Sequence, residues 1–595
     1  MNHLHAIDYV IVGGYFAFAI FVGLFFSRRA SRSPEDFFLG GRSLPWWAIG
    51  VSMAATSFAS DTPLVITEVI RQYGIQRLWW ILAAVMVLIV GIFLFSRLWR
   101  RAEIITDAEF YELRYEGRPA AFLRGFRAFS SGIIQNLITM GWVIFGMTTI
   151  ITTLTGLDER LAISICIVVA LTYSTAAGFY GVVATDVVQF VIATVSMLML
   201  AVLSVYQAGG LASILDNIKN MPEYGEYTLE MFPDVTHFNN DLAALIVFLG
   251  LLWWSDAGGY NMQRMSACRN ERDAVKATLF YAVFQSIRIW LWVPVALVSI
   301  VWFPVLAEPY SDTHAYPMVM RDALGPGLLG LLVTSFLAAF MSTIDTHLNW
   351  GTSYLMNDVY RRFLRPQATN KEYMLATRVV TVVLMVSAAA VVPLMNSVSR
   401  AWEFLAIVFV GYGIVSVARW FWWRINAYTE ITALALGLLF GIVDLFSATF
   451  ANDNLVLFGT QWTELRFEIK IAMLVAIVVP ISLVVTMLTP PVSMSKLEEF
   501  YRRLRPGGAW GPVSAQTKKL PGRALTWSSL LDIAGGLALC YGLSVAIGYC
   551  LLMKFYAACF CLGCAVLGSL RVAHWYQREI AELGGADSGK ENKST

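Results

Sequence analysis

Long apolar segments recur along almost the whole chain, from position 9 to position 573. Many approach the length of about 20 residues that carries a helix across the hydrocarbon core of a bilayer. A membrane β-barrel would instead show shorter segments of alternating polarity. The pattern therefore predicts an all-α integral membrane protein with about fifteen helices. The expected spans are residues 6–26, 45–70, 75–99, 125–155, 159–177, 181–207, 240–260, 272–303, 326–358, 371–395, 401–424, 428–448, 467–489, 528–552 and 554–573.

Composition and charge agree with this class. The chain is 57% hydrophobic and 14% charged, and its net charge of +2 gives no reason to expect a nucleic-acid partner. Clusters of Lys and Arg fall on one side of the bilayer if the N-terminus lies outside, which also places the C-terminus in the cytoplasm. We therefore expect a multi-pass protein of the plasma (inner) membrane. Six of the seven cysteines lie in or against apolar spans, so no external disulfide is indicated.

The second span contains the polar sequence SFASDTP at positions 57–63. Pro63 cannot donate a backbone hydrogen bond, and its ring crowds the carbonyl of Ala59 four residues earlier. Irregular backbone at membrane depth is tolerated where it is buried in protein or lines a cavity. With Asp61 in the same segment, the sequence favours an interrupted helix that lines a polar cavity. The alternative is a simple proline kink with Asp61 satisfied by a neighbouring helix.

A second interruption is predicted in WWSDAGGYN, positions 253–261, where Gly258 and Gly259 follow Asp256. It falls five spans after the first. Interrupted helices at corresponding places in two halves indicate an inverted-repeat transporter with its binding site near the bilayer midplane. The alternative is that residues 255–261 begin a cytoplasmic loop.

The span 326–358 contains the polar sequence AAFMSTIDTHLN at positions 338–349. At about 100° per residue, four of its residues share one helical stripe and two more extend the edge. An oxygen-rich stripe suits a hard cation such as sodium, with the Ala59 carbonyl completing the site if the two helices meet. Alternatively, these hydroxyls bond carbonyls of their own helix. The stripe is Ala339, Ser342, Thr343 and Thr346, with Asp345 and Asn349 at its edge.

Five sequence motifs, in order, resemble those of the sodium:solute symporter family. They are DFFLGGRSLPWW at 36–47, TDAEFYELRYEG at 106–117, AAGFYGVVATDVVQF at 176–190, YNMQRMSACRNERDA at 260–274 and FLAAFMSTIDTHLN at 336–349. The resemblance covers most of residues 6–490. It implies a five-plus-five inverted-repeat (LeuT-like) core with one leading helix and about four extra C-terminal helices.

The expected organisation divides the chain into eight segments. These are a leading helix (1–35), a first repeat (36–207), an extracellular loop (208–239), a second repeat (240–425), additional helices (426–489), a cytoplasmic basic loop (490–527) that lies against anionic headgroups, C-terminal helices (528–575) and a disordered tail (576–595).

The resemblance also implies two cation sites. The first comprises the carbonyls of Ala59, Thr62 and Ala339 with the hydroxyls of Ser342 and Thr343. The second comprises Asp186, Ser342, Asp345 and Thr346. Asp345 departs from the hydroxyl usual in the family, so it could strengthen a cation site or share a proton with Asp186. The implied solute pocket and gate comprise Asp61, Gln135, Trp253, Trp254 and Asp256.

The expected function is sodium-coupled import of a small organic solute by alternating access, with Na⁺ as coupling ion and no organic cofactor. The alternatives are proton or sodium/proton coupling, or a sensor or channel of the same fold. An enzyme is not expected, because Asp345 and His347 point about 160° apart on a helix. Neither the identity of the solute nor the oligomeric state follows from the sequence.

Overall fold

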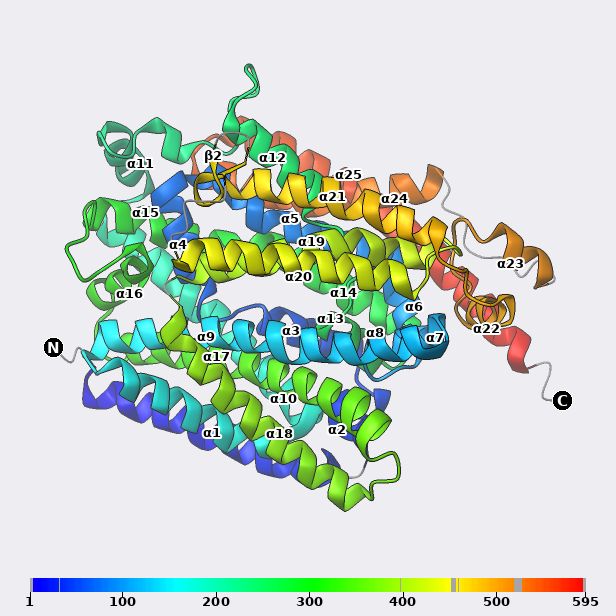
Figure 1. Ribbon diagram of the computed structural model, residues 1–595. Helices are drawn as coiled ribbons and strands as arrows, with labels where there is room; N and C mark the ends of the chain where they lie inside the picture. The colour runs from blue at the N-terminus through cyan, green and yellow to red at the C-terminus, as the bar shows by residue number, and fades with distance from the viewer. Residues whose placement is uncertain are drawn as a thin grey trace.

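The computed structural model describes residues 4–30, 33–395, 397–450, 456–457, 460–517 and 527–591. The fold is helical, as predicted, and twelve helices among these residues are long and apolar enough to cross a membrane. The strands described are the two-residue pair β1 (Val456–Leu457) and β2 (Thr460–Gln461). Figure 1 shows the N-terminus, α4 and β2 toward one end of the helical bundle, and α7, α22, α23 and the C-terminus at the other. These helices are α4 (Thr62–Tyr73), α7 (Glu109–Arg114), α22 (Met494–Leu504) and α23 (Gly511–Gln516).

The first predicted interruption is confirmed. Helix α3 (Trp46–Thr56) ends before residues 57–61, and α4 begins after them. Pro63 lies in the first turn of α4. Backbone N–H groups there have no intrahelical acceptor, so the N–H that proline lacks costs the helix no hydrogen bond. The Ala59 carbonyl accepts a hydrogen bond from the backbone nitrogen of Thr62 at 3.4 Å.

The second interruption is also confirmed, against the alternative of a loop. Helices α12 (Asn240–Leu251) and α13 (Tyr260–Ala267) flank residues 252–259. Gly259 has φ +67°, and a Cβ there would lie 3.2 Å from the Trp350 ring. Glycine is therefore required both by the backbone conformation and by the close approach of the helix that contains Trp350.

Three helices enclose the first interruption: α9 (Asn136–Thr155), α10 (Glu159–Gln207) and α17 (Leu328–Ser353). Helix α10 is continuous where two spans, 159–177 and 181–207, were expected. The segment between them contains glycine but no proline, and glycine is tolerated inside membrane helices. A Cβ on Gly146 of α9 would lie 2.8 Å from the Asp61 Cα, so α9 packs directly on the interrupted segment.

The remaining helices complete the bundle. α24 and α25 are separate, joined through residues 552–554, and α25 continues to Glu591, where a disordered tail was expected from residue 576. The other helices are α1 (Ala6–Ala30), α2 (Pro34–Leu39), α5 (Trp79–Val90), α6 (Ser96–Ala102), α8 (Gly117–Phe129), α11 (Leu211–Asn220), α14 (Glu271–Ile287), α15 (Val293–Trp302), α16 (Asp312–Ala323), α18 (Asn370–Val391), α19 (Val398–Phe421), α20 (Ala427–Phe450), α21 (Phe467–Leu488), α24 (Trp527–Leu551) and α25 (Phe555–Glu591).

The expected basic loop 490–527 contains ordered structure that packs on the bundle. Leu497, Phe500 and Leu504 of α22 are fully buried. The indole nitrogen of Trp510 donates to the Trp420 carbonyl at 2.9 Å, which attaches this segment to the end of α19. The apolar side chains of the segment therefore pack against protein.

Candidate ion and solute site

The carboxylate of Asp186 joins three helices. It lies on α10 and accepts hydrogen bonds from Ser52 of α3 and Ser342 of α17, each at 2.5 Å. Asp186 is fully buried. Hydroxyl donors compensate part of the cost of burying an anion, because they replace hydrogen bonds to water. The sequence motif around TDVVQ thus supplies an anchor for the interrupted helix.

Backbone and hydroxyl oxygens gather between α3 and α17. Thr343 donates to the Thr56 carbonyl at 2.9 Å and to the Ala339 carbonyl at 3.1 Å. Thr56 is the last residue of α3, so its carbonyl belongs to the final turn, where helices have unsatisfied acceptors. With the Ser342 hydroxyl one residue away, this arrangement offers the oxygen donors that a hard cation prefers.

The two helices therefore meet as the sequence predicted, but at a different carbonyl. The one in contact with Thr343 belongs to Thr56, one turn before Ala59. Ala59 instead bonds the Thr62 nitrogen, as described above, and Thr62 is a buried residue that begins α4. Counting four residues back from Pro63 identified Ala59, whereas the helix had already ended at Thr56.

A buried arginine occupies the region of the expected second cation site. One Arg264 nitrogen donates to the hydroxyls of Thr56 and Thr346, both at 2.6 Å. Another donates to Ser52 at 3.2 Å, and the guanidinium lies 3.8 Å from the Asp186 carboxylate. Arg264 was not among the site residues expected from the sequence. The signal available was its place one helical turn after the glycines of the second interruption.

Asp345 is a buried residue of α17, next to Thr346 in the sequence. It is 2% exposed. The Tyr15 phenol of α1 is within electrostatic reach of both Asp345 and Asp186. Of the residues expected at the second site, Asp186 and Thr346 lie beside Arg264, and Ser342 donates to Asp186. Asp345 and Asp186 both act electrostatically on Tyr15.

Asp61 lies in the interrupted segment and is only 1% exposed. Within the described chain, neither of its carboxylate oxygens has a hydrogen-bond partner. Arg288, which begins the short helix Arg288–Leu291, donates to the Ser57 carbonyl, and its charge acts on Asp61. The Trp402 indole nitrogen approaches the same carboxylate as a weak hydrogen-bond donor. Such buried, unsatisfied groups are costly unless a ligand completes them.

Asp256 belongs to a separate ion network. Its carboxylate accepts from Arg419 at 2.6 Å and from the Trp420 indole at 2.8 Å. Arg419 also donates to Glu430 at 3.0 Å, and Tyr115 donates to Glu430 at 2.5 Å. The Asp256 side chain is therefore committed to holding the second interruption against α19.

The other residues expected in the solute pocket are Trp253, Trp254 and Gln135. The Trp253 and Trp254 rings stack on each other with centroids 4.3 Å apart, and Trp254 donates to the Gly250 carbonyl of α12. Gln135 is half-buried at the end of the π-helical segment 130–135. Its neighbour Asn136 makes the contact with α17, because its side chain bonds the His347 ring and carbonyl, both at 2.8 Å.

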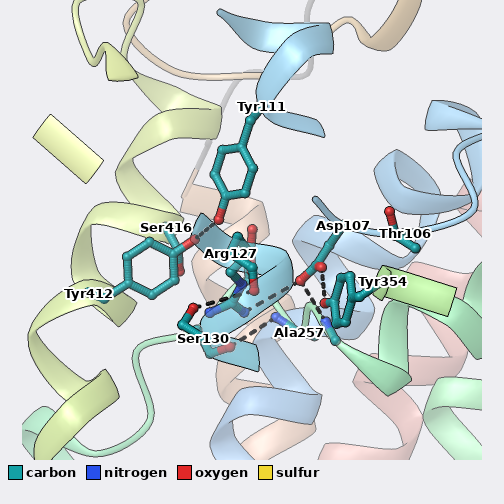
Figure 2. A network of polar contacts seen from close by, with 12 residues as sticks. Thr106, Asp107, Tyr111, Arg127, Ser130, Ala257, Tyr354, Tyr412 and Ser416 are labelled. Carbon is teal, nitrogen blue, oxygen red and sulfur yellow. Dashed lines mark hydrogen bonds and ion pairs between the residues drawn. The ribbon is translucent and has the colours of Figure 1, made fainter. Parts of the chain in front are cut away.

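A polar network closes the end of the bundle near α7. Figure 2 shows Asp107, Tyr354 and Arg127 converging, with Tyr111 and Tyr412 in contact beside them. Asp107 accepts from the Gly259 backbone nitrogen at 2.9 Å and from the Tyr354 hydroxyl, and lies 3.5 Å from Arg127. The two tyrosine hydroxyls are 2.7 Å apart. These residues were not identified as functional from the sequence, although TDAEFYELRYEG contains two of them.

The opposite end of the bundle is hollow. A cavity of about 740 Å³ lies between α4, α12, α19 and the start of α21. Two interrupted helices, a closed network at one end and a cavity at the other define a secondary transporter of LeuT-like fold.

Comparison with known proteins identifies the family. The model of the sodium:solute symporter family matches residues 37–437, and the chain belongs to that family. The sodium/glucose cotransporter of Vibrio parahaemolyticus is 25% identical over 471 residues, 74% of this chain and 85% of that protein. The sodium/mannose cotransporter SLC5A10 of Bos taurus is 24% identical over 476 residues, 74% of this chain and 79% of that protein.

The fold agrees with a solved relative. A Na⁺-coupled sialic acid symporter in a substrate-bound outward-open state superposes with a TM-score of 0.67 at 18% identity, covering 82% of this chain and 99% of that one. This protein is therefore a multi-pass membrane transporter, not an enzyme, and it couples movement of a small solute to sodium.

Proposed function

We propose that the chain imports an organic solute with sodium bound between α3 and α17. The ligands are the carbonyls of Thr56 and Ala339 with the hydroxyls of Ser342 and Thr343. The observation that carries this proposal is the Thr343–Thr56 contact beside the Asp186–Ser342 hydrogen bond. Sodium there would hold α3 against α17 and so favour the conformation in which these helices are together.

Membrane potential supplies part of the driving force. One sodium ion moving inward through about 100 mV releases about 2.3 kcal/mol, which concentrates a neutral solute roughly fifty-fold before any sodium gradient is counted. Import in this direction goes with an external N-terminus and a location in the plasma membrane. The orientation is the one that the predicted charge asymmetry of the loops favours.

The second cation position is proposed to hold Arg264 in place of a second sodium. The guanidinium lies 3.8 Å from Asp186 and donates to Thr346, so a sodium ion there would face a fixed positive charge. Ala59 and Thr62 remain candidate ligands from the interrupted segment. Asp345 then either binds a further cation or holds a proton.

Replacing Asp345 with Ser separates these two roles. With Arg264 at the second position, we expect the sodium Hill coefficient of uptake to stay near about 1 while the pH dependence of uptake changes, because a shared proton is lost. The measurement is sodium-dependent uptake into proteoliposomes across a pH series. A wild-type Hill coefficient above about 1 that falls in the variant would assign Asp345 to cation binding, and no change in either quantity would remove it from the mechanism.

We propose that the solute supplies hydrogen-bond partners for the Asp61 carboxylate. A solute that offers a positive charge or several hydroxyl donors would satisfy both carboxylate oxygens, and an acceptor on it would satisfy the Trp402 indole. The rings of Trp80 and Trp402, 6.2 Å apart, separate this position from the cavity above. The remaining expected residues, Gln135, Trp253 and Trp254, stay candidate solute contacts.

A thermal-stability screen tests this assignment. Purified protein is heated with a metabolite library in sodium and then in potassium, because a ligand that binds the folded state stabilises it. We expect the stabilising solute to require sodium, and Asp61→Asn to lose the solute shift while keeping the sodium shift. Asp216→Asn, on exposed α11, is the matched control. A solute shift unchanged in Asp61→Asn would exclude Asp61 from the pocket.

A further inference from the structure

The cavity at the α4 end contains a second unsatisfied carboxylate. Glu68 of α4 is 7% exposed and lines the cavity. Its Oε1 atom accepts from Ser399 at 2.9 Å and from Ser397 at 3.3 Å, while Oε2 has no partner in the described part of the chain. Glu403, one turn beyond Ser399 on α19, lines the same space. Two carboxylates thus face one chamber.

Three of the four cations that line the cavity pair with carboxylates other than Glu68 and Glu403. Arg77 lies 3.3 Å from Glu468, and Lys470 lies 2.7 Å from Asp444. Arg466 pairs with Glu468 and Asp241. Arg400 is exposed at the rim, and its charge reaches both Glu68 and Glu403. Five carboxylates and four cations line the cavity, so the carboxylates outnumber the cations by one.

Aromatic rings form the apolar part of the same wall. Trp79, Trp80, Phe248 and Phe404 line the cavity together with Glu68, and the Arg77 guanidinium already lies over the Phe248 ring, 4.9 Å from its centroid. Carboxylates among aromatic faces are the environment that proteins use to recognise an ammonium group, through ion pairing and cation–π attraction. A bare metal ion is a poorer fit, because no cluster of three His, Cys, Asp or Glu side chains suited to a metal occurs among the described residues.

We propose that this cavity is a binding site for the ammonium group of a small solute, with Glu68 and Glu403 as its anions. The ammonium group can belong to an organic cation or to a zwitterion whose carboxylate reaches Arg400. The site lies on the cavity side of the Trp80–Trp402 pair and is distinct from Asp61. This proposal depends on the proposed import function only for the side of the membrane from which the solute arrives.

Ligand-observed NMR on the purified full-length protein tests the proposal. The probes are choline, glycine betaine and 3,3-dimethylbutan-1-ol, the neutral isostere of choline. Titrations are made in potassium without sodium, so the proposed sodium site does not contribute. We expect choline to bind wild type at least about tenfold more tightly than the neutral alcohol, a difference of roughly 1.4 kcal/mol. Binding of betaine as well as choline identifies zwitterions as ligands, and binding of choline alone restricts the site to cations.

Variants locate the binding. Glu68→Gln combined with Glu403→Gln is expected to reduce choline affinity at least tenfold, and Glu403→Gln alone to reduce it part of the way. Glu226→Gln, an exposed carboxylate outside the cavity, is the control and should bind like wild type. Thr343→Ala should also bind normally, so failure of the sodium-site assignment leaves this result unchanged. Equal binding of choline and its neutral isostere, or unchanged binding in the double variant, overturns the proposal.

Discussion

Removing the hydroxyl of Thr343 is expected to raise the sodium concentration for half-maximal solute uptake at least tenfold. That oxygen bridges α17 to the last carbonyl of α3, at 2.9 Å from Thr56. A hydrogen bond or ligand contact to a charged group contributes about 1.5–3 kcal/mol, which corresponds to a factor of ten or more in affinity. Thr343→Ala removes the oxygen, and sodium-dependent uptake in proteoliposomes measures the consequence.

Two further variants make the result specific. Thr343→Ser keeps the oxygen and should restore sodium affinity to within a few-fold of wild type. Ser335→Ala removes a hydroxyl from the same buried helix, but that hydroxyl bonds the Leu332 carbonyl of α17 itself, so sodium affinity should not change. Thermal unfolding in potassium separates lost stability from lost ion binding. Wild-type sodium affinity in a folded Thr343→Ala protein would exclude the proposed ligand set.

The interruptions of two helices could be predicted because local chemistry causes them. Pro63 and Gly259 act through their own backbones, and no distant contact is needed to recognise them. The register of the site could not be predicted in the same way. The last turn of α3 contacts α17 and the following segment packs on Gly146 of α9, and these contacts come from residues far away in sequence.

Pairing between distant helices explains two charged residues, Arg264 and Asp256, whose surroundings in the structure differ from those expected. Arg264 was not expected in the site, but α13 is buried and the Arg264 guanidinium reaches α3, α10 and α17. Asp256 was expected in the solute pocket, yet it faces Arg419 of α19, 163 positions later. A sequence shows which charges lie inside the membrane, whereas their pairing depends on how the helices are arranged around them.

The pairing of Asp256 predicts the largest effect on stability. Arg419 is 1% exposed and lies between Asp256 and Glu430, which are themselves buried. Arg419→Met would leave both carboxylates without their cation, and breaking a buried ion pair in this way costs about 3–5 kcal/mol. We expect the melting temperature of the purified protein to fall by several degrees, or the folded yield to be lost. Arg502→Met, on the exposed side of α22, should melt like wild type.

The charge, more than the shape, is expected to cause this loss. In Arg419→Met combined with Asp256→Asn and Glu430→Gln, the neutral amides keep the hydrogen-bonding positions that Trp420 and Tyr115 use, and neither position carries a carboxylate charge that has lost its cation. The triple variant should therefore recover most of the melting temperature that Arg419→Met loses, since replacing a whole buried ion network is far less costly than removing one member. If the triple variant melts as low as the single variant, the guanidinium contributes through packing against Phe110 and Tyr111, whose rings lie 4.3 and 5.2 Å from it.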